Sequence, residues 1–306
     1  MTKKKSLVDR ITHRLCSLIF KLISRVLCSL GIAKPKVIIY MDGGICSQMH
    51  VYLCGEQYRR LGLKVLFDTY WFDKNGKDLD GRFERNLELG EMFPDLPLYT
   101  IRGRKGWYYR NFFSVQNRQC LLPVPESIRR TSYLGGFYHL FPTDEYKDMF
   151  VSCFGRGAMG AIPLHIPINK NGTNCAVHVR RGDLANRDEQ FYKDNPWYKP
   201  LSNEYFLNAI KYVSEHYPNV RFYFFSEELD WVEANLCPKI SAPYQLMRGN
   251  KGYVDLALIS ECDVVIGSQG SFGKMGARLN GNADFFDPSP ESELGFEIKN
   301  FSKELF

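Results

Sequence analysis

The segment with the clearest chemical potential is His178-Val179-Arg180-Arg181-Gly182-Asp183. It follows a short apolar segment, Cys175 to Val179, which is typical of a buried strand. Each planar guanidinium donates paired hydrogen bonds to anionic oxygens and keeps its charge at every physiological pH. Arg180 and Arg181 therefore predict a diphosphate site, and a nucleotide sugar is the first ligand to test. The alternative is a structural ion pair with Asp183 or a neighbouring acid.

Two more segments place small or polar residues directly after a candidate strand. Ser226-Glu227-Glu228 is one, and Ser268-Gln269-Gly270-Ser271-Phe272-Gly273 is the other. In the second segment, glycines would let backbone N–H groups approach a phosphate, and serines could donate to the same oxygens. Ligands of parallel α/β sheets bind at the carboxyl ends of strands. The nucleotide contacts that we predict here are His178, Ser226, Gly270, Ser271 and Phe272.

Strands alternate with helices through the part of the chain that carries these segments. This alternation indicates an α/β fold with a parallel sheet that is covered on both faces. A stretch rich in Gly and Pro, Gly155 to Pro167, suggests a domain boundary at about residue 168. The expected strands are Asn174–Arg180, Arg221–Ser226, Asp263–Ser268 and Ala283–Asp287, and the expected helices are Ser202–Tyr217, Glu228–Leu236 and Tyr253–Cys262.

The first half shows the same alternation after Pro35. A strand at Val37–Met41 leads into Asp42-Gly43-Gly44 and a helix at about Gln48–Leu61. Gly43, Gly44 and Gln48 would lie at this strand end, and we predict that they contact the ligand. Further strands are expected at Leu63–Phe67, Leu98–Ile101 and Ser132–Tyr138, and the basic, aromatic stretch Arg102–Asn111 fits either a sugar or lipid-headgroup surface or half-buried aromatics among solvated charges.

The first 36 residues are strongly basic. They hold nine Lys or Arg residues against Asp9 alone, a net +8, whereas the whole chain carries +6. The other 270 residues are slightly acidic, which disfavours a protein that binds nucleic acid as a whole. Within this segment apolar residues recur at helical spacing, and Arg14, Lys21 and Arg25 interrupt them before any run could cross a bilayer. The stripe consists of Leu7, Ile11, Leu15, Leu18, Leu22 and Val26.

We expect this segment to be an amphipathic helix that lies on an anionic membrane surface. The alternative is a helix that packs on the protein's own surface. The expected location is cytoplasmic, peripheral on the inner face of the cytoplasmic membrane. Nine cysteines without metal-ligand spacing fit reduced thiols in that compartment.

Several segments together resemble the α-1,2-fucosyltransferases of glycosyltransferase family 11. His178 to Asp183 matches the family's His-x-Arg-Arg-x-Asp motif, and the other segments follow in family order over about residues 37–290. Cys46-Ser47 and Gly273-Lys274-Met275 differ from the family pattern, which suggests a divergent member acting on a bacterial surface polysaccharide. The other matching segments are Asp42 to Met49, Gly135 to Tyr138 with Tyr146, Phe225 to Glu228 with Trp231, Asp255-Leu256 with Ser260 and Cys262, and Ser271-Phe272 with Gly276 to Asn280.

The resemblance implies a GT-B-like architecture of two Rossmann-like domains facing a cleft. The expected division is an N-terminal helix at 1–36, an acceptor domain at 37–168 and a GDP-sugar domain at 169–306. The implied reaction is inverting, metal-independent transfer of L-fucose from GDP-β-L-fucose to a hydroxyl, with galactose O2 the expected acceptor atom. The acceptor would be a glycan or a lipid-linked oligosaccharide.

Roles can be argued from the charge that grows on the departing GDP. Arg180 and Arg181 would stabilise that charge, with Ser271 and nearby backbone N–H groups assisting. The base that accepts the acceptor's proton stays open among Asp183, Asp42, Glu56 and His50, and His178 is expected to be a buried structural residue. Asp255 would accept hydrogen bonds from guanine or ribose, or serve as a helix N-terminal charge.

No cofactor or metal is expected. Asp78-Leu79-Asp80 spells the DxD pattern of metal-dependent sugar transferases, but it lies in a run of charged residues that favours a solvated loop. Two alternatives to the fucosyltransferase stay open: transfer of another sugar from a guanine-linked donor, and a non-catalytic scaffold that binds sugar nucleotides in a polysaccharide assembly complex.

Overall fold

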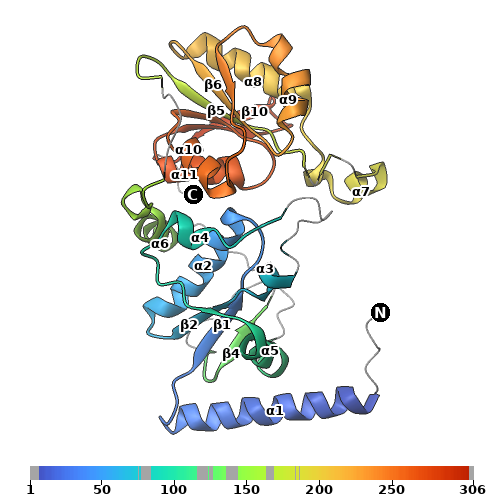
Figure 1. Ribbon diagram of the computed structural model, residues 1–306, viewed down its shortest axis with the longest axis vertical. Helices are drawn as coiled ribbons and strands as arrows, with labels where there is room; N and C mark the ends of the chain where they lie inside the picture. Colours follow the sequence, from blue (N-terminus) through green and yellow to red (C-terminus); the bar gives the residue numbers. More distant parts are fainter. Residues whose placement is uncertain are drawn as a thin grey trace. The chain divides into compact units, whose positions relative to one another are not determined.

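The computed structural model divides the chain into two compact α/β units (Figure 1). Unit 1 draws its described residues from 7–90 and 95–135, and unit 2 from 91–94 and 144–302. This division falls before residue 144, whereas the sequence suggested a boundary near 168. The structure describes residues 7–74, 76, 84–115, 123, 127–135, 144–162, 169–182, 184–185 and 187–302.

Unit 1 has a four-stranded parallel sheet in the order β3-β2-β1-β4. The central strand β1 is buried through Val37, Ile38 and Ile39, as expected of a strand with neighbours on both edges. Helix α2 packs closely on the sheet, because a Cβ on Gly55 would lie 2.7 Å from Cζ of Phe67. The strands are β1 (Lys36–Tyr40), β2 (Lys64–Asp68), β3 (Thr100–Ile101) and β4 (Ser132–Leu134), and the helices are α1 (Leu7–Ser29), α2 (Ile45–Arg60), α3 (Tyr70–Lys74) and α5 (Gly103–Phe112). The residues of the short helix α4 (Leu89–Met92) are divided between the two units.

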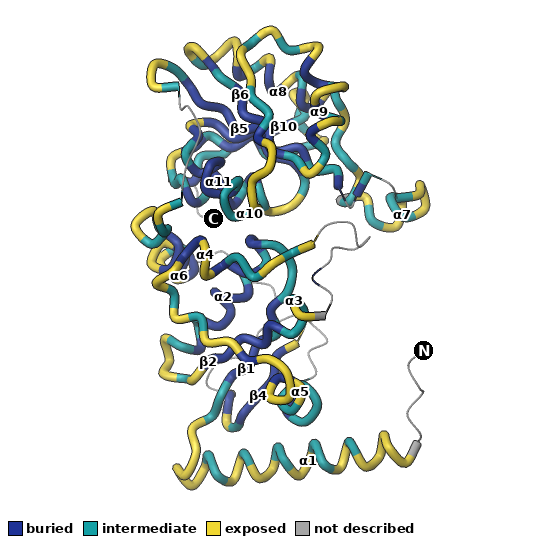
Figure 2. The backbone as a smooth tube through the Cα atoms, viewed as in Figure 1, coloured by how far each residue is buried: buried dark blue, intermediate teal, exposed yellow. Residues whose placement is uncertain are grey.

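Unit 2 has a six-stranded sheet in the order β10-β9-β8-β5-β6-β7, parallel except for the β9–β10 pair. Strands β5 and β8 are buried along their whole length and β6 along all but its first residue, and Figure 2 shows β5 and β6 largely in dark blue. The edge strands β7 and β10 are mostly half-buried or exposed. The strands are β5 (Asn174–His178), β6 (Arg221–Phe225), β7 (Tyr244–Leu246), β8 (Val264–Ile266), β9 (Asp284–Pro288) and β10 (Phe296–Asn300). The helices are α6 (Asp144–Phe154), α7 (Glu189–Asp194), α8 (Asn203–His216), α9 (Leu229–Asn235), α10 (Gly252–Ile259) and α11 (Phe272–Asn280), with short 3-10 turns at Arg156–Ala158, Pro196–Tyr198 and Cys237–Lys239.

Alternate residues of β6 pack into two separate cores. Phe222 and Phe224 join a core that includes residues of α8, whereas Tyr223 and Phe225 join one that includes residues of α10 and α11. The sheet is therefore covered on both faces, and its central strands β5, β6 and β8 are short, largely apolar runs. The predicted α/β class, with two units built on parallel sheets after an N-terminal amphipathic helix, is confirmed.

Some elements differ from the expectation. The basic, aromatic stretch at 102–111 forms the helix α5, and α6 was not predicted. The antiparallel strand β10 was also missed, because its alternating charges gave no apolar run. Within the described residues, no helix is long and apolar enough to span a membrane.

Candidate functional site

The three predicted strand ends of unit 2 lie side by side. Strand β5 pairs with β6 on one edge and with β8 on the other, and Val177 is in register with both Phe224 and Ile266. From β5 the chain runs outward through β6 and β7, and then returns to the other side of β5 as β8. This change of direction makes the β5–β8 junction a topological switch point, where ligands of open α/β sheets bind.

Arg180 lies against the loop that follows β8. Its backbone N–H donates to Oγ of Ser268 at 3.2 Å, and its side chain covers Gly270. Gly270 has a φ of +98°, and a Cβ there would lie only 2.3 Å from Nη1 of Arg180. The positive φ favours glycine at position 270, and the absence of a Cβ leaves room for the Arg180 guanidinium to lie against the loop.

Helix α11 begins at this loop. Its N-cap residue, Ser271, makes no side-chain capping bond, and Phe272 is the first helical residue. The free N–H groups and positive dipole end of a helix N-terminus favour an anion. Arg180, the glycine loop with Gly270 and Ser271, and the start of α11 at Phe272 therefore converge on the switch point.

His178 is buried beneath the same loop. Its ring lies 5.2 Å from that of Phe272, and a Cβ on Gly273 would lie 3.5 Å from its Nδ1. Burial, with the charge of Arg180 adding to it, lowers the pKa of His178 to about 3. The imidazole is therefore neutral at physiological pH. Among the described residues its Nδ1 has no hydrogen-bond partner.

Arg181 points into different surroundings. Its Nε lies 3.4 Å from Oε2 of Glu228, and its guanidinium stacks 3.8 Å from the centre of the Trp231 ring. These contacts match the structural ion pair that was the alternative for this residue. Glu228, at the N-cap of α9, makes no capping bond, while Oγ of Ser226 accepts from its backbone N–H at 3.0 Å. Both Arg181 and Ser226 therefore stabilise the turn after β6.

Asp255, a predicted nucleotide contact, and Lys274, a departure from the family pattern, both make local interactions in unit 2. Asp255 lies in the first turn of α10, where its Oδ1 accepts from Nδ2 of Asn250 at 2.8 Å, in agreement with the helix-start alternative. Lys274, which replaces a family residue, pairs with Asp287 at 3.0 Å. Asp183 and the Asp78-Leu79-Asp80 motif lie outside the described residues.

Gln48 of unit 1, which was predicted to contact the ligand, has a structural role in the fold. It is fully buried, and its Nε2 donates to Gly43 O at 3.0 Å and to Asn86 O at 2.7 Å. Its Oε1 accepts from the backbone N–H groups of Glu88 and Leu89 at 2.9 and 3.1 Å. All four hydrogen-bonding positions of the amide are used, so Gln48 holds the loop after β1 to residues 86–89 and has none left for a ligand.

The glycines at the end of β1 shape a tight turn. Gly43 has a φ of +76°, and a Cβ there would lie 2.8 Å from Cβ of Ser47. Gly44 is the N-cap of α2. Asp42 beside them is half-buried, and burial raises the pKa of its carboxyl. Glu56, another candidate base, instead pairs with Arg59 and Arg60 at 2.5 and 3.6 Å.

Unit 1 contains a buried charged cluster that was not predicted from the sequence. Asp68 ends β2 with no exposed surface, accepts from the hydroxyl of Tyr133 at 3.0 Å and lies 3.4 Å from Arg110. A Cβ on Gly106 would lie 2.7 Å from its Oδ1. Burial is the main cause that raises the pKa of the Tyr133 hydroxyl, and the charge and hydrogen bond of Asp68 raise it further. The sequence could have indicated this cluster, because Asp68 directly follows the apolar strand candidate Leu63–Phe67. The same pattern of a polar residue after an apolar run was used to predict the strand ends of unit 2.

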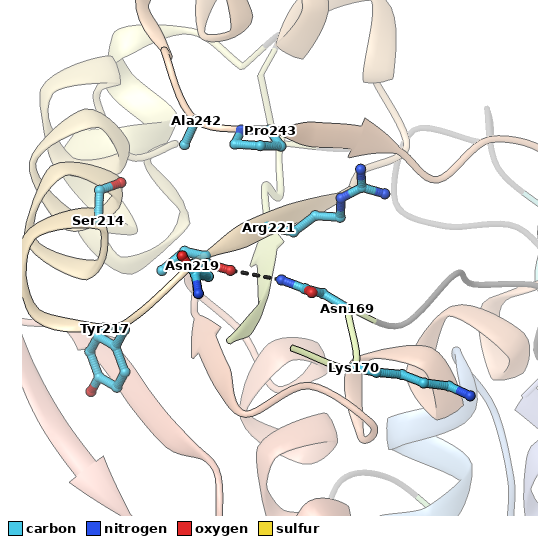
Figure 3. A pocket seen from close by; sticks show the side chains of 9 residues that line it. Asn169, Lys170, Ser214, Tyr217, Asn219, Arg221, Ala242 and Pro243 are labelled. Carbon is cyan, nitrogen blue, oxygen red and sulfur yellow. Dashed lines mark hydrogen bonds between the residues drawn. The ribbon is translucent and has the colours of Figure 1, made fainter. Parts of the chain in front are cut away.

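A polar hollow lies at the opposite edge of the unit 2 sheet (Figure 3). Arg221 and Pro243 line it at the amino ends of β6 and β7, and Asn169 Nδ2 donates to Asn219 O at 2.7 Å beside it. Because ligands of parallel sheets collect at the carboxyl edge, we do not assign the donor site here. In the described part of the chain, no three His, Cys, Asp or Glu side chains form a group that could hold a metal ion.

Comparison with known proteins identifies relatives among sugar transferases. The model of glycosyl transferase family 11 matches residues 127–286, more than half of the chain. The chain is 27% identical over 143 residues to the alpha-1,2-colitosyltransferase of Escherichia coli, covering 40% of this chain and only 48% of that relative's length. It is 23% identical over 293 residues to the O-antigen biosynthesis glycosyltransferase WbnK of Escherichia coli, covering 82% of this chain and 92% of the relative.

Two solved structures are similar at low identity. POFUT1 in complex with GDP-fucose is 11% identical, with 80% of this chain and 94% of that chain covered and a TM-score of 0.40. The E. coli heptosyltransferase WaaC with ADP is 10% identical, with 83% and 88% covered and a TM-score of 0.41.

Proposed function

This chain belongs to glycosyl transferase family 11, and from that premise we propose that it transfers L-fucose from GDP-β-L-fucose to a glycan hydroxyl with inversion and without a metal ion. Galactose O2 is the proposed acceptor atom, and the product belongs to a bacterial surface polysaccharide. Two relatives, named for an alpha-1,2 linkage and for O-antigen biosynthesis, support these two assignments.

The observation that carries the proposal is the contact between Arg180 and Gly270 at the switch point of unit 2. The guanidinium lies on a glycine loop that leads directly into the N-terminus of α11. A diphosphate at this place would meet a permanent cation, free backbone N–H groups and a helix dipole. We assign the β-phosphate of the donor to this position.

The chemistry requires a fixed positive group at that phosphate. As the bond from fucose C1 to the phosphate oxygen breaks, negative charge grows on GDP, and the acceptor oxygen forms the new bond to C1 while its proton passes to a general base. A preorganised donor aimed at this charge contributes about 2.7–4 kcal/mol to the barrier reduction. Arg180 is our catalytic assignment, and Arg181 is a positioning residue that holds the adjacent turn through Glu228 and Trp231.

Substitution of Arg180 tests the assignment. Arg180→Ala should lower the rate of transfer from GDP-fucose by about 100-fold or more, because one charge-stabilising donor is lost. The matched control is Arg248→Ala, an exposed arginine of unit 2 that pairs only locally with Asp230 and Glu233, and it should keep the parent rate. Turnover in excess EDTA should equal turnover without it, and loss of activity there would refute the metal-free proposal.

A second donor deserves a parallel assay, because one relative is named for colitose. GDP-fucose and GDP-colitose are offered to the same protein with a panel of galactosides, and the linkage is determined by NMR. Faster transfer of colitose than of fucose would identify GDP-colitose, and not GDP-fucose, as the donor. Binding of GDP without release of sugar from either donor would favour a non-catalytic scaffold.

A further inference from the structure

Helix α1 is held on unit 1 by one of its faces. The ring of Phe20 packs 5.5 Å from that of Tyr108 and 5.0 Å from that of Phe112, and Oγ of Ser17 donates to Phe112 O at 3.0 Å. Further along, Oγ of Ser24 accepts from the backbone N–H of Thr131 at 3.0 Å. Residues 17, 20 and 24 share one face of a helix, so the docked face is defined.

The opposite face of α1 is apolar and exposed. Figure 2 shows the helix in yellow and teal along its length, with no buried segment. A soluble helix normally turns its apolar stripe toward the core, whereas α1 turns it away. The stripe consists of Ile11, Leu15, Leu18, Ile19, Leu22 and Val26, whose side chains are between 46% and 64% exposed.

One edge of the same helix is basic. Arg14, Lys21 and Arg25 follow each other at helical spacing between the docked face and the apolar stripe. Arg14 and Arg25 form no ion pair with any described residue, and Lys21 donates only to Ser114 O at 2.9 Å. Burial and the charge of Arg130 lower the pKa of Lys21, and burial and the charge of Arg25 lower the pKa of Arg130.

We propose that the exposed stripe of α1 lies in the headgroup region of an anionic lipid bilayer, with the basic edge bound to lipid phosphates. An apolar face that is unpartnered within its own unit, bordered by a row of cations, is the pattern of an interfacial helix. The charge selects lipid over a second copy of the chain, because two such basic edges would repel each other. This proposal rests on unit 1 and does not depend on the donor assigned to unit 2.

Cosedimentation of the full chain with lipid vesicles tests the proposal. The protein should bind vesicles of phosphatidylcholine and phosphatidylglycerol, and bind pure phosphatidylcholine far less. Leu15→Glu/Leu22→Glu should weaken binding to the anionic vesicles by about tenfold or more, because two apolar side chains no longer enter the bilayer. Arg14→Glu/Arg25→Glu should abolish the preference for anionic lipid, and added salt should reduce it.

The matched control places glutamate at exposed apolar positions of unit 1 outside α1. Leu61→Glu/Tyr99→Glu, at side chains that are 57% and 60% exposed, should bind vesicles like the parent protein. Turnover of a soluble galactoside by Leu15→Glu/Leu22→Glu should also stay at the parent rate, so that a failed membrane proposal is distinct from a failed donor assignment.

Three results would overturn the proposal. The first is absence of vesicle binding by the parent chain, and the second is parent-like binding by Leu15→Glu/Leu22→Glu. The third is self-association, seen by sedimentation velocity, that the same double substitution abolishes while vesicles bind neither protein. That result would assign the stripe to a second copy of the chain.

Discussion

Arg180 and Arg181 are adjacent in the sequence but meet different partners. Arg180 lies on the loop after β8 at Gly270, whereas Arg181 lies on the turn after β6 with Glu228 and Trp231. Successive residues of an extended segment point to opposite sides, so one strand end serves both neighbouring strands. The diphosphate role predicted for the pair is therefore proposed for Arg180 alone.

His178 gives a pH-dependent prediction. Its folded pKa of about 3 lies below its usual value of 6.5, so at acidic pH the unfolded chain binds a proton that the folded chain does not. Stability is then lost as the pH falls from 6.5 toward 3. At pH 5 the loss from this residue should be about 2 kcal/mol relative to neutral pH. Urea unfolding of the parent and of His178→Asn at several pH values measures the difference in slope.

The control for that experiment is His216→Gln, at a histidine that is exposed on α8. It should keep the acid slope of the parent protein, whereas His178→Asn should have a shallower one. Equal slopes for the parent and His178→Asn would show that the buried imidazole takes up a proton in the folded state.

Individual contacts were the least predictable part of the site. The strand ends that carry Arg180, Ser226 and Gly270 could be located from apolar runs followed by polar residues. The pairing of Arg181 with Glu228, and the four bonds of Gln48, join segments far apart in sequence, and no local pattern encodes them. Asp68 could have been predicted in the same way, because it directly follows the apolar run of β2.

Helices α10 and α11 pack against each other through a glycine. A Cβ on Gly276 would lie 2.3 Å from Cγ2 of Ile259 and 2.8 Å from its Cβ, and neither atom can swing away as a long side chain could. Because the N-terminus of α11 forms part of the proposed donor site, this packing fixes an element that contacts the ligand.

Gly276→Ala should therefore lower the free energy of unfolding by about 1–3 kcal/mol through overpacking. It should also weaken GDP binding, because α11 must shift. Gly157→Ala is the matched control, since a Cβ there meets no atom within 4 Å. Chemical denaturation and GDP titration of both variants give the comparison. A stable Gly276→Ala variant with parent affinity would show that α11 does not need this close approach.

Most elements of the parallel sheets were predictable because buried strands are short apolar runs. The observed bounds of β5, β6 and β9 differ from the predicted ones by one or two residues. The orientation of α1 was not predictable: its periodicity defined an apolar stripe, but only the contacts of Phe20 and Ser17 show that the other face docks.

The division into two units predicts where GDP acts in the whole molecule. If the diphosphate binds in unit 2, saturating GDP should slow amide hydrogen exchange there, at residues 177–182 and 270–275 above all. A ligand at a hundred times its Kd stabilises the unit that binds it by about 2.7 kcal/mol, and this stabilisation slows the exchange of amides in that unit. Exchange in unit 1 should change much less. Mass spectrometry of proteolytic peptides measures exchange in each unit separately.

The same experiment on Arg180→Ala should show little protection at either segment. Protection that appears only in unit 1 would contradict the donor assignment, and it would direct attention to the loop of Gly43 and Gly44. The sequence supported the assignment of the donor to the second unit through its charged strand ends, but the switch point itself depends on strand order, which only the structure provides.

The docking of α1 has a mechanical consequence. The bonds that Ser17, Lys21 and Ser24 make to Phe112, Ser114 and Thr131 are spread over about two turns of the helix, so α1 and the sheet of unit 1 turn together as one body. A bilayer that binds α1 would therefore hold unit 1 in one orientation instead of on a loose tether. Acceptors that diffuse laterally in the lipid would then always meet the same side of the enzyme, and their search would be reduced from three dimensions to two.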